Sequence, residues 1–241
     1  MSYRLVLWDI DHTLIDAHHF HRALYREAFR KLTGRAPRHL LFMTGRTDRD
    51  SMTETLQLNG IEPTELRLSD LSQALVQAME LKKDYLRKCG RQTVGAELAL
   101  RRLQDLPGIV QSALTGNLKP LAIAKLSTLG LDGYLDYDVG GYGEDHAERY
   151  QLVGIARGRA EAKYGTAFDG DNTVLIGDTL RDVQAGHLGG APVVAVATGY
   201  VTAAELDAAG ADRVLEDLSD TEAVLKAILE TVRRTDQPQA S

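Results

Sequence analysis

The stretch YRLVLWDIDHTLID, residues 3–16, places two aspartates, Asp9 and Asp11, directly after an apolar run. Residues 5–8, LVLW, are continuously apolar, which is typical of a strand buried on both faces of a parallel sheet. Carboxylates at the end of such a strand cost free energy unless a positive charge lies close to them. The stretch therefore predicts a buried first strand with an acidic site at its carboxyl end.

Apolar segments of the same kind recur later in the chain, and segments with a helical period separate them. The further strands are predicted within residues 109–117, 173–179 and 191–199. The helices between them are predicted within residues 120–130, 147–165 and 180–190. This alternation implies an α/β fold, a Rossmann-like parallel sheet with helices on both faces.

Residues 17–90 differ from the rest because they form amphipathic helical patterns with no convincing strand between them. We interpret them as an all-helical insertion between the first and second strands. The expected domains are thus an α/β core of residues 1–16 and 91–235 and a helical domain of residues 17–90. The polar residues 236–241 are expected to be a flexible tail.

Composition restricts the function. The 241 residues carry a formal net charge of -6 and no long basic tract, which argues against nucleic acid as a partner. The single cysteine, Cys89, excludes an internal disulfide framework. No apolar run approaches the roughly 18 residues of a membrane helix. We expect a cytoplasmic protein, a monomer or homodimer, that contacts neither nucleic acid nor membrane.

A second acidic pair follows the strand predicted near residue 175. Asp178 and Asp182 would lie at the same edge of the sheet as Asp9 and Asp11, because ligands of open α/β sheets bind at the carboxyl ends of the strands. Four carboxylates in one crevice repel one another unless a cation is present, and hard oxygen ligands suit Mg²⁺. Residues Asp9, Asp11, Asp178 and Asp182 are therefore the predicted Mg²⁺ site.

Groups suited to phosphate oxygens occur nearby in the predicted fold. Thr115 and Gly116 end another strand, where a hydroxyl and free backbone N–H groups can hold an oxyanion. Arg149, near the start of a helix, supplies a planar charged fork for the same oxygens. Purely structural roles are alternatives for some of these residues: Asp178 could be a helix N-cap, and Arg149 could form a solvated salt bridge with Glu144 or Glu148.

Together, DIDHTL, LTGN, an arginine at the start of a helix and GDTLRD resemble, in this order, the four motifs of the haloacid dehalogenase superfamily of aspartate-nucleophile phosphohydrolases. The helical insertion matches the position of that family's C1 cap. Within the family, the arrangement is similar to phosphoglycolate phosphatases and β-phosphoglucomutases. The resemblance covers most of the chain and implies a small phosphorylated metabolite as the substrate.

The resemblance also implies roles for individual residues. Asp9 would be the nucleophile that becomes an aspartyl phosphate, and Asp11 the general acid and base. Mg²⁺ would be bound by the Asp9 carboxylate, the Asp11 backbone carbonyl and Asp178, with Asp182 orienting the site. The remaining implied contacts are to the phosphate oxygens, from Thr115, Gly116 and Arg149.

Two departures from the family pattern bear on the site. His12 stands where the family commonly has glycine, so the turn must tolerate a side chain. The third motif is more often lysine, which leaves Lys119 and Lys163 as weaker alternatives to Arg149. His12, together with Thr44 and Arg46 between the predicted helices of the insertion, is a candidate for selecting the substrate.

We expect a Mg²⁺-dependent phosphatase that hydrolyses a small phosphomonoester. The alternative enzyme is a phosphomutase of the β-phosphoglucomutase kind, which shares every core residue and differs in where the phosphoryl group goes. An alternative of another class is a phospho-accepting signalling module, which the long helical insertion fits poorly.

Overall fold

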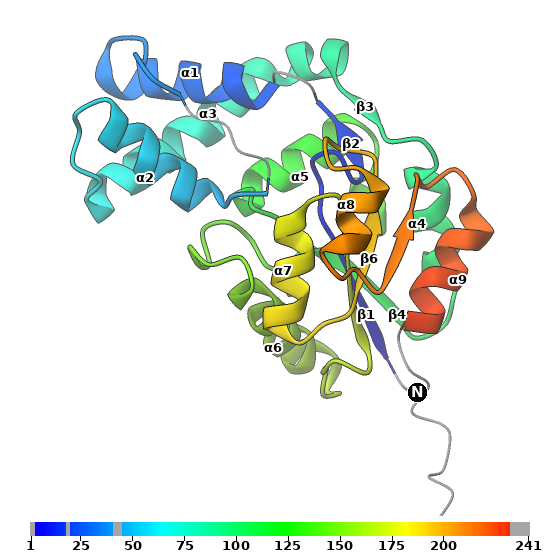
Figure 1. The fold of residues 1–241 in the computed structure, drawn as a ribbon. Coiled ribbons are helices and arrows are strands. Elements are labelled where there is room, and N and C mark those ends of the chain that lie inside the picture. The colour runs from blue at the N-terminus through cyan, green and yellow to red at the C-terminus, as the bar shows by residue number, and fades with distance from the viewer. Residues whose placement is uncertain (1–2, 18–19, 41–44, 232–241) are drawn as a thin grey trace, which may run out of the picture.

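The computed structural model describes residues 3–17, 20–40 and 45–231. A five-stranded parallel sheet in the order β4-β1-β5-β6-β7 lies at its centre (Figure 1). The strands are β1 (Arg4–Trp8), β4 (Ile109–Ala113), β5 (Thr173–Gly177), β6 (Val193–Val196) and β7 (Arg213–Leu215). The predicted α/β class is confirmed, and the C-terminal tail 236–241 lies outside the described residues.

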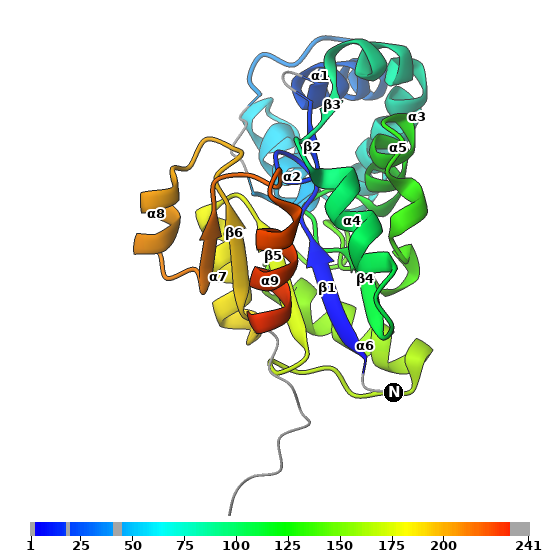
Figure 2. The same ribbon diagram turned by 90° about the vertical axis from the view of Figure 1, so that its right-hand side faces the viewer.

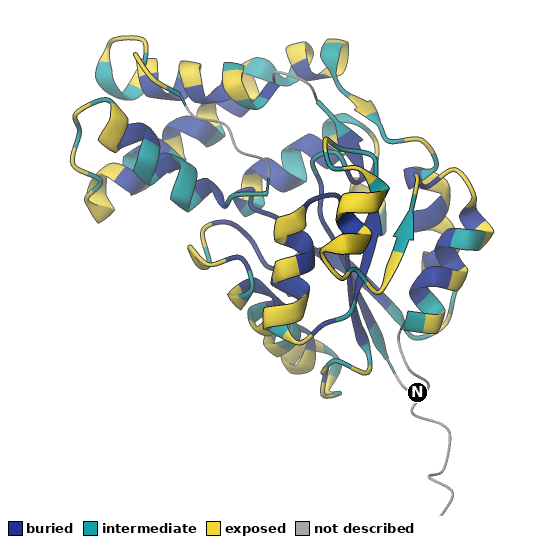
Figure 3. Cartoon of the chain, viewed as in Figure 1, coloured by how far each residue is buried: buried dark blue, intermediate teal, exposed yellow. Residues whose placement is uncertain are grey.

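Helices cover both faces of this sheet (Figure 2). Val6 and Trp8 of β1 pack with one helical layer, whereas Leu5 and Leu7 pack with the other. The first layer is α4 (Ala96–Gln104), α5 (Lys119–Thr128) and α9 (Thr221–Thr231), and the second is α6 (Gln151–Tyr164), α7 (Leu180–Gly189) and α8 (Ala203–Ala208). Successive strand residues face opposite layers, so LVLW has to be apolar throughout. Strands β1, β4, β5 and β6 are almost entirely buried, whereas the edge strand β7 and the outer helix surfaces are partly or fully exposed (Figure 3).

Three helices between β1 and β4 form a separate layer beside the carboxyl ends of the strands (Figure 1). We call them the helical unit: α1 (Phe20–Thr33), α2 (Asp48–Leu58) and α3 (Glu65–Cys89). Their buried side chains form one hydrophobic cluster, which Leu118 and Leu121 at the start of α5 complete. Where the chain leaves and re-enters the core, β2 (Ile15–Asp16) and β3 (Arg91–Gln92) pair antiparallel. The helical unit is therefore joined to the core by two chain crossings and by packing on α5.

The boundaries differ from the sequence patterns at one functionally important place. The helix predicted from residue 147 begins only at Gln151, and residues 147–150 form a tight turn. The amides of Gln151 and Leu152 bond carbonyls three residues back, which is the geometry of a 3₁₀ turn. Short helical turns at Asp132–Tyr134 and Tyr137–Val139 and the short edge strand β7 carry no clear periodicity and were not predicted. Within the described ranges, no helix combines the length and hydrophobicity needed to cross a bilayer.

Candidate active site

Three central strands bring the predicted motifs to one edge of the sheet. Strand β1 lies between β4 and β5, and Trp8 is in register with Ala113 on one side and Ile176 on the other. Asp9 follows β1, Thr115 follows β4 and Asp178 follows β5. Because the three strands are parallel and in register, residues about a hundred positions apart in the sequence meet at the same height.

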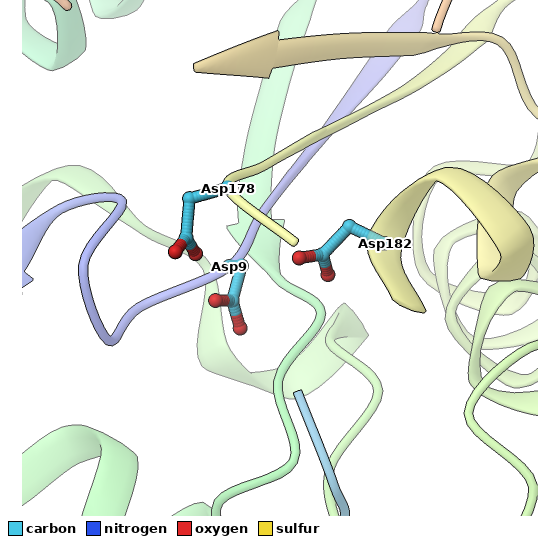
Figure 4. Close-up of side chains that lie close together, drawn as sticks. All are labelled: Asp9, Asp178 and Asp182. Carbon is cyan, nitrogen blue, oxygen red and sulfur yellow. The ribbon is translucent and has the colours of Figure 1, made fainter. Parts of the chain in front are cut away.

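Three carboxylates converge at this edge. One carboxylate oxygen from each of Asp9, Asp178 and Asp182 lies within 4.8 Å of the others, and all three residues are buried (Figure 4). The Thr13 hydroxyl donates to Asp178 Oδ1 at 3.2 Å, while Asp178 Oδ2 is buried without a hydrogen-bond partner among the described residues. A buried carboxylate oxygen with nothing to accept from indicates a position for a cation.

The electrostatics of the cluster agree with that position. Burial raises the pKa of Asp178 to about 9, and the charges of Asp9 and Asp182 add to the effect. Burial also raises the pKa of Asp9 to about 7, although Arg149 opposes the shift. These carboxyls therefore cannot all ionise near neutral pH without further positive charge. Three carboxylates with oxygens this close together form an all-oxygen donor set, which fits Mg²⁺, the ion that the sequence predicts.

Helix α7 holds the third carboxylate by its own capping. Thr179, not Asp178, is the N-cap residue, so the interpretation of Asp178 as a helix cap is wrong. Asp182 Oδ2 accepts from the Thr179 amide at 3.0 Å and its hydroxyl at 2.6 Å. A side chain on Gly177 would meet the Asp182 carboxylate at 2.3 Å, so a glycine is needed where β5 ends. The capping box therefore fixes Asp182 and leaves its Oδ1 facing the cluster.

Arg149 is the cation in direct contact with this cluster. Its Nη2 donates to Asp9 Oδ1 at 2.7 Å and to Asp182 Oδ1 at 2.6 Å, and the side chain is 8% exposed. The alternative of a solvated salt bridge with Glu144 or Glu148 is wrong, because the guanidinium turns inward. The tight turn that delays α6 delivers it to the sheet edge.

The weaker lysine candidates lie elsewhere. Lys119 pairs with Asp138 at 3.3 Å, and Lys163 pairs with Asp136 at 2.8 Å, both at partly exposed positions. Of the three cations weighed from the sequence, only Arg149 contacts Asp9.

The loop after β4 presents a hydroxyl beside the acidic cluster. Thr115 Oγ1 accepts hydrogen bonds from the Asn117 backbone amide at 3.2 Å and from Asn117 Nδ2 at 2.8 Å. Both contacts use the oxygen as an acceptor, so the hydroxyl hydrogen remains available to an anionic ligand. The next residue, Gly116, lies against the helical unit, and a side chain there would meet the Arg46 carbonyl oxygen at 1.9 Å.

Asp11 is held by a residue that the sequence reasoning missed. Lys125 Nζ lies 2.8 and 2.6 Å from the two carboxylate oxygens of Asp11, and Asn117 Nδ2 donates to Asp11 Oδ2 at 2.8 Å. Burial opposes ionisation of Asp11, but Lys125 and Asn117 outweigh it and hold its pKa below the usual range. A signal was present in the sequence: Lys125 is a charged residue on the apolar face of PLAIAKLSTLG, four residues after Leu121.

A cavity of about 750 Å³ lies between the sheet edge and the helical unit, and it is lined by Asp9, Asp11, Thr115, Gly116 and Arg149 among others. Arg46, predicted to read the substrate, lines it too, but its guanidinium is neutralised by Asp50 at 2.6 Å and by Glu54. Arg22 and Arg181 also line the cavity and form no ion pair with any described residue. The positive charge that is left for a ligand therefore comes from these two arginines.

His12 occupies the turn after β1 in an unusual conformation. Its φ of 65° makes it the one residue other than glycine with a positive φ in the described part of the chain. Its ring packs edge-on against Tyr200, with centroids 5.1 Å apart, and both rings line the cavity. The expectation that this turn tolerates a side chain is confirmed, and Thr44 lies outside the described residues.

Comparisons with known proteins agree with this architecture. A family model described as haloacid dehalogenase-like hydrolase matches residues 3–190. None of the curated proteins compared with the sequence matches it.

Solved structures similar to this one include a predicted phosphatase from Clostridium acetobutylicum, with a TM-score of 0.66, 20% identity and coverage of 95% of this chain and 100% of that one. A hydrolase from Pseudomonas syringae has a TM-score of 0.67 and 24% identity, covering 93% and 99%. CbbY from Rhodobacter sphaeroides in complex with phosphate has a TM-score of 0.65 and 17% identity, covering 91% and 96%. At these identities the structures establish a shared fold. The family match, over most of the chain, shows that this protein belongs to the haloacid dehalogenase-like hydrolases.

Proposed function

We propose that this protein is a Mg²⁺-dependent phosphatase that hydrolyses a small phosphomonoester through an aspartyl phosphate on Asp9. The observation that carries the proposal is the convergence of the Asp9, Asp178 and Asp182 carboxylates, which Arg149 also reaches, beside the hydroxyl of Thr115. Carboxylates that could hold a metal ion, an arginine and a hydroxyl arranged in this way are suited to phosphoryl transfer.

In the first step, an Asp9 carboxylate oxygen attacks phosphorus, and the bond from phosphorus to the ester oxygen breaks. Asp11, in its carboxylic acid form, gives its proton to the departing oxygen and becomes a carboxylate. In the second step, water attacks the phosphorus of the aspartyl phosphate, gives its proton to Asp11 and releases phosphate from Asp9. Lys125 stabilises the carboxylate that Asp11 has become after the first step, and this carboxylate is suited to accept that proton.

The carboxylates of Asp9 and Asp178 and the backbone carbonyl of Asp11 would hold Mg²⁺, and Asp182 would orient the site. When bound, Mg²⁺ would neutralise charge between the nucleophile and the phosphate. Thr115, the Gly116 amide and Arg149 would bind the phosphate oxygens that are not transferred.

We propose that residues 17–90 act as a C1-type cap on a core of residues 1–16 and 91–235. The cap would exclude water and select the substrate, because Arg22, Arg46 and His21 of this segment line the cavity. Arg22 and Arg181, which form no ion pair with a described residue, favour a small anionic metabolite, as in a phosphoglycolate phosphatase-like enzyme.

The test is phosphate release from a panel of phosphomonoesters, with and without Mg²⁺, by the wild type and by Asp9→Asn. Asp207→Asn, an exposed change on α8, is the matched control. We expect release that requires Mg²⁺ and falls by at least about 10³-fold in Asp9→Asn only. Isomerisation of a sugar phosphate without phosphate release would identify a phosphomutase instead, and a long-lived phosphorylated protein would identify a phospho-accepting module.

A further inference from the structure

Lys125 of α5 lies beside the candidate site but does not line its cavity. Its three ammonium hydrogens meet three acceptors: Asp11 Oδ1 at 2.8 Å, Asp11 Oδ2 at 2.6 Å and Asn117 Oδ1 at 2.7 Å. The residue has no exposed surface. Lys125 is therefore a buried charge with every donor used and none left for a ligand.

Stability alone does not account for a lysine at this position. A buried ammonium loses its hydration, and a well-packed apolar side chain in its place is often neutral or stabilising when the partner charge is also removed. Lys125 lies on the face of α5 that carries Leu121, Ala122 and Leu126, which are all fully buried. An apolar residue would continue that face, so the charge is best explained by what it holds.

Lys125 holds two side chains that follow different strands, the predicted acid and base Asp11 and the amide of Asn117. Asp11 follows β1, and it receives two hydrogen bonds from Lys125 directly. Asn117 follows β4, and its Oδ1 is fixed by Lys125 while its Nδ2 donates to both Asp11 and Thr115 at 2.8 Å. The amide can make these bonds only in one orientation, because its oxygen and nitrogen are distinct. One ammonium thus orients the carboxylate of Asp11 both directly and through Asn117.

We propose that Lys125 is a positioning residue: it holds the Asp11 carboxylate in the orientation from which it exchanges a proton with the ester oxygen and with water. The inference rests on the proposed phosphatase function. Of the predicted Mg²⁺ site, Lys125 contacts only the Asp11 side chain, and it forms no hydrogen bond with Asp9, Asp178 or Asp182. It acts through Asp11, and its effect on turnover exists only while Asp11 is present.

The experiment is a double-mutant cycle on turnover, with Lys125→Met, Asp11→Asn and the double variant measured in full-length protein. The substrates are an aryl phosphate, whose leaving group needs no proton, and an alkyl phosphate. We expect Lys125→Met to lower kcat on the alkyl phosphate by about 100-fold, the order of loss that misplacing a reacting group by about 1 Å produces. KM should stay within about threefold, because the residue makes no contact in the cavity.

Two results would identify positioning rather than a structural role. The loss should be larger for the alkyl than for the aryl phosphate, as in Asp11→Asn. In the Asp11→Asn background, Lys125→Met should lower kcat by less than about threefold, because residues that act as a unit are not additive. The proposal would be overturned if Lys125→Met lowered kcat by the same factor on both esters, and by the same factor in the wild type and in Asp11→Asn.

Arg157→Met is the structural control, because Arg157 bonds Thr173 and the carbonyls of Gly189 and Gly190 away from the cavity. It should lower the melting temperature without changing the ratio between the two esters. If Lys125→Met does not fold, Lys125→Gln tests the same cycle with a neutral donor. An inactive wild type would refute the proposed function. If the wild type is active but the effects of Lys125→Met and Asp11→Asn on kcat are independent of each other, only the role of Lys125 is refuted.

Discussion

Arg149 joins Asp9 and Asp182, two of the three buried carboxylates, through a single nitrogen, and this contact governs the charge balance of the site. The nucleophile predicted from the sequence is thus paired with a cation before any ligand binds. A buried pair of this kind contributes little by its presence, but removing one partner leaves an uncompensated charge.

Arg149→Met should therefore destabilise the protein by about 3 kcal/mol in the absence of Mg²⁺. Excess Mg²⁺ should recover much of that loss, because the ion supplies positive charge to the same carboxylates. Chemical denaturation with and without Mg²⁺ measures both quantities. Arg102→Met, which breaks the exposed pair with Glu222, should cost less than about 1 kcal/mol and show no Mg²⁺ dependence. An equal cost for the two variants would contradict this account of Arg149.

At the level of the elements, the first turn of α7 combines helix capping with the acidic site. Thr179 caps the helix and fixes Asp182, whose other oxygen faces Asp9. Thr179→Ala should lower stability by about 1 kcal/mol and should also lower kcat, because Asp182 loses its anchor. Thr202→Ala removes the same kind of capping box from α8, so it should cost similar stability and leave kcat unchanged. Calorimetry and steady-state kinetics on both variants separate the two effects.

The loop after β4 is where the helical unit meets the core through the backbone. The Asp48 amide donates to the Gly116 carbonyl at 2.6 Å, and Asp48 Oδ2 accepts from the Leu118 amide at 2.9 Å. These bonds tie the start of α2 to the loop after β4 and require the close approach that glycine allows at position 116.

Gly116→Ala should push α2 away from this loop, since the new methyl group would overlap the Arg46 carbonyl. We expect faster amide hydrogen exchange at the start of α2 and a kcat/KM lower by at least about tenfold. Gly133→Ala is the matched control, because nothing lies within 4 Å of an added methyl there. Unchanged exchange in Gly116→Ala would show that the contact is not needed for docking.

For the whole molecule, we expect the cluster of buried carboxylates to make folding stability depend on the predicted ion. Because Mg²⁺ binds a site that only the folded chain assembles, it should stabilise the protein by about 2.7 kcal/mol at one hundred times its dissociation constant. Thermal unfolding across a Mg²⁺ titration measures this shift, and a chelator should reverse it. Asp178→Asn should remove the dependence, whereas Asp207→Asn should keep it. A wild-type melting temperature that does not change with the Mg²⁺ concentration would contradict the metal assignment.

The sequence by itself determined the fold class and the order of the acidic motifs. Continuous apolar runs such as LVLW can be satisfied only by strands buried on both faces, and the carboxyl ends of parallel strands share an edge. Asp9, Thr115 and Asp178 could therefore be predicted to meet, because local pattern and topology carry that information.

Only the tertiary structure decided which partners these residues have. Arg149 turns toward Asp9 because a tight turn delays α6, and Lys125 reaches Asp11 because α5 packs beside β1. Likewise, Arg46, which precedes α2, is neutralised by Asp50 and Glu54 of that helix. Local periodicity cannot rank such contacts, since the partner of a charged side chain depends on distances between elements that only packing sets.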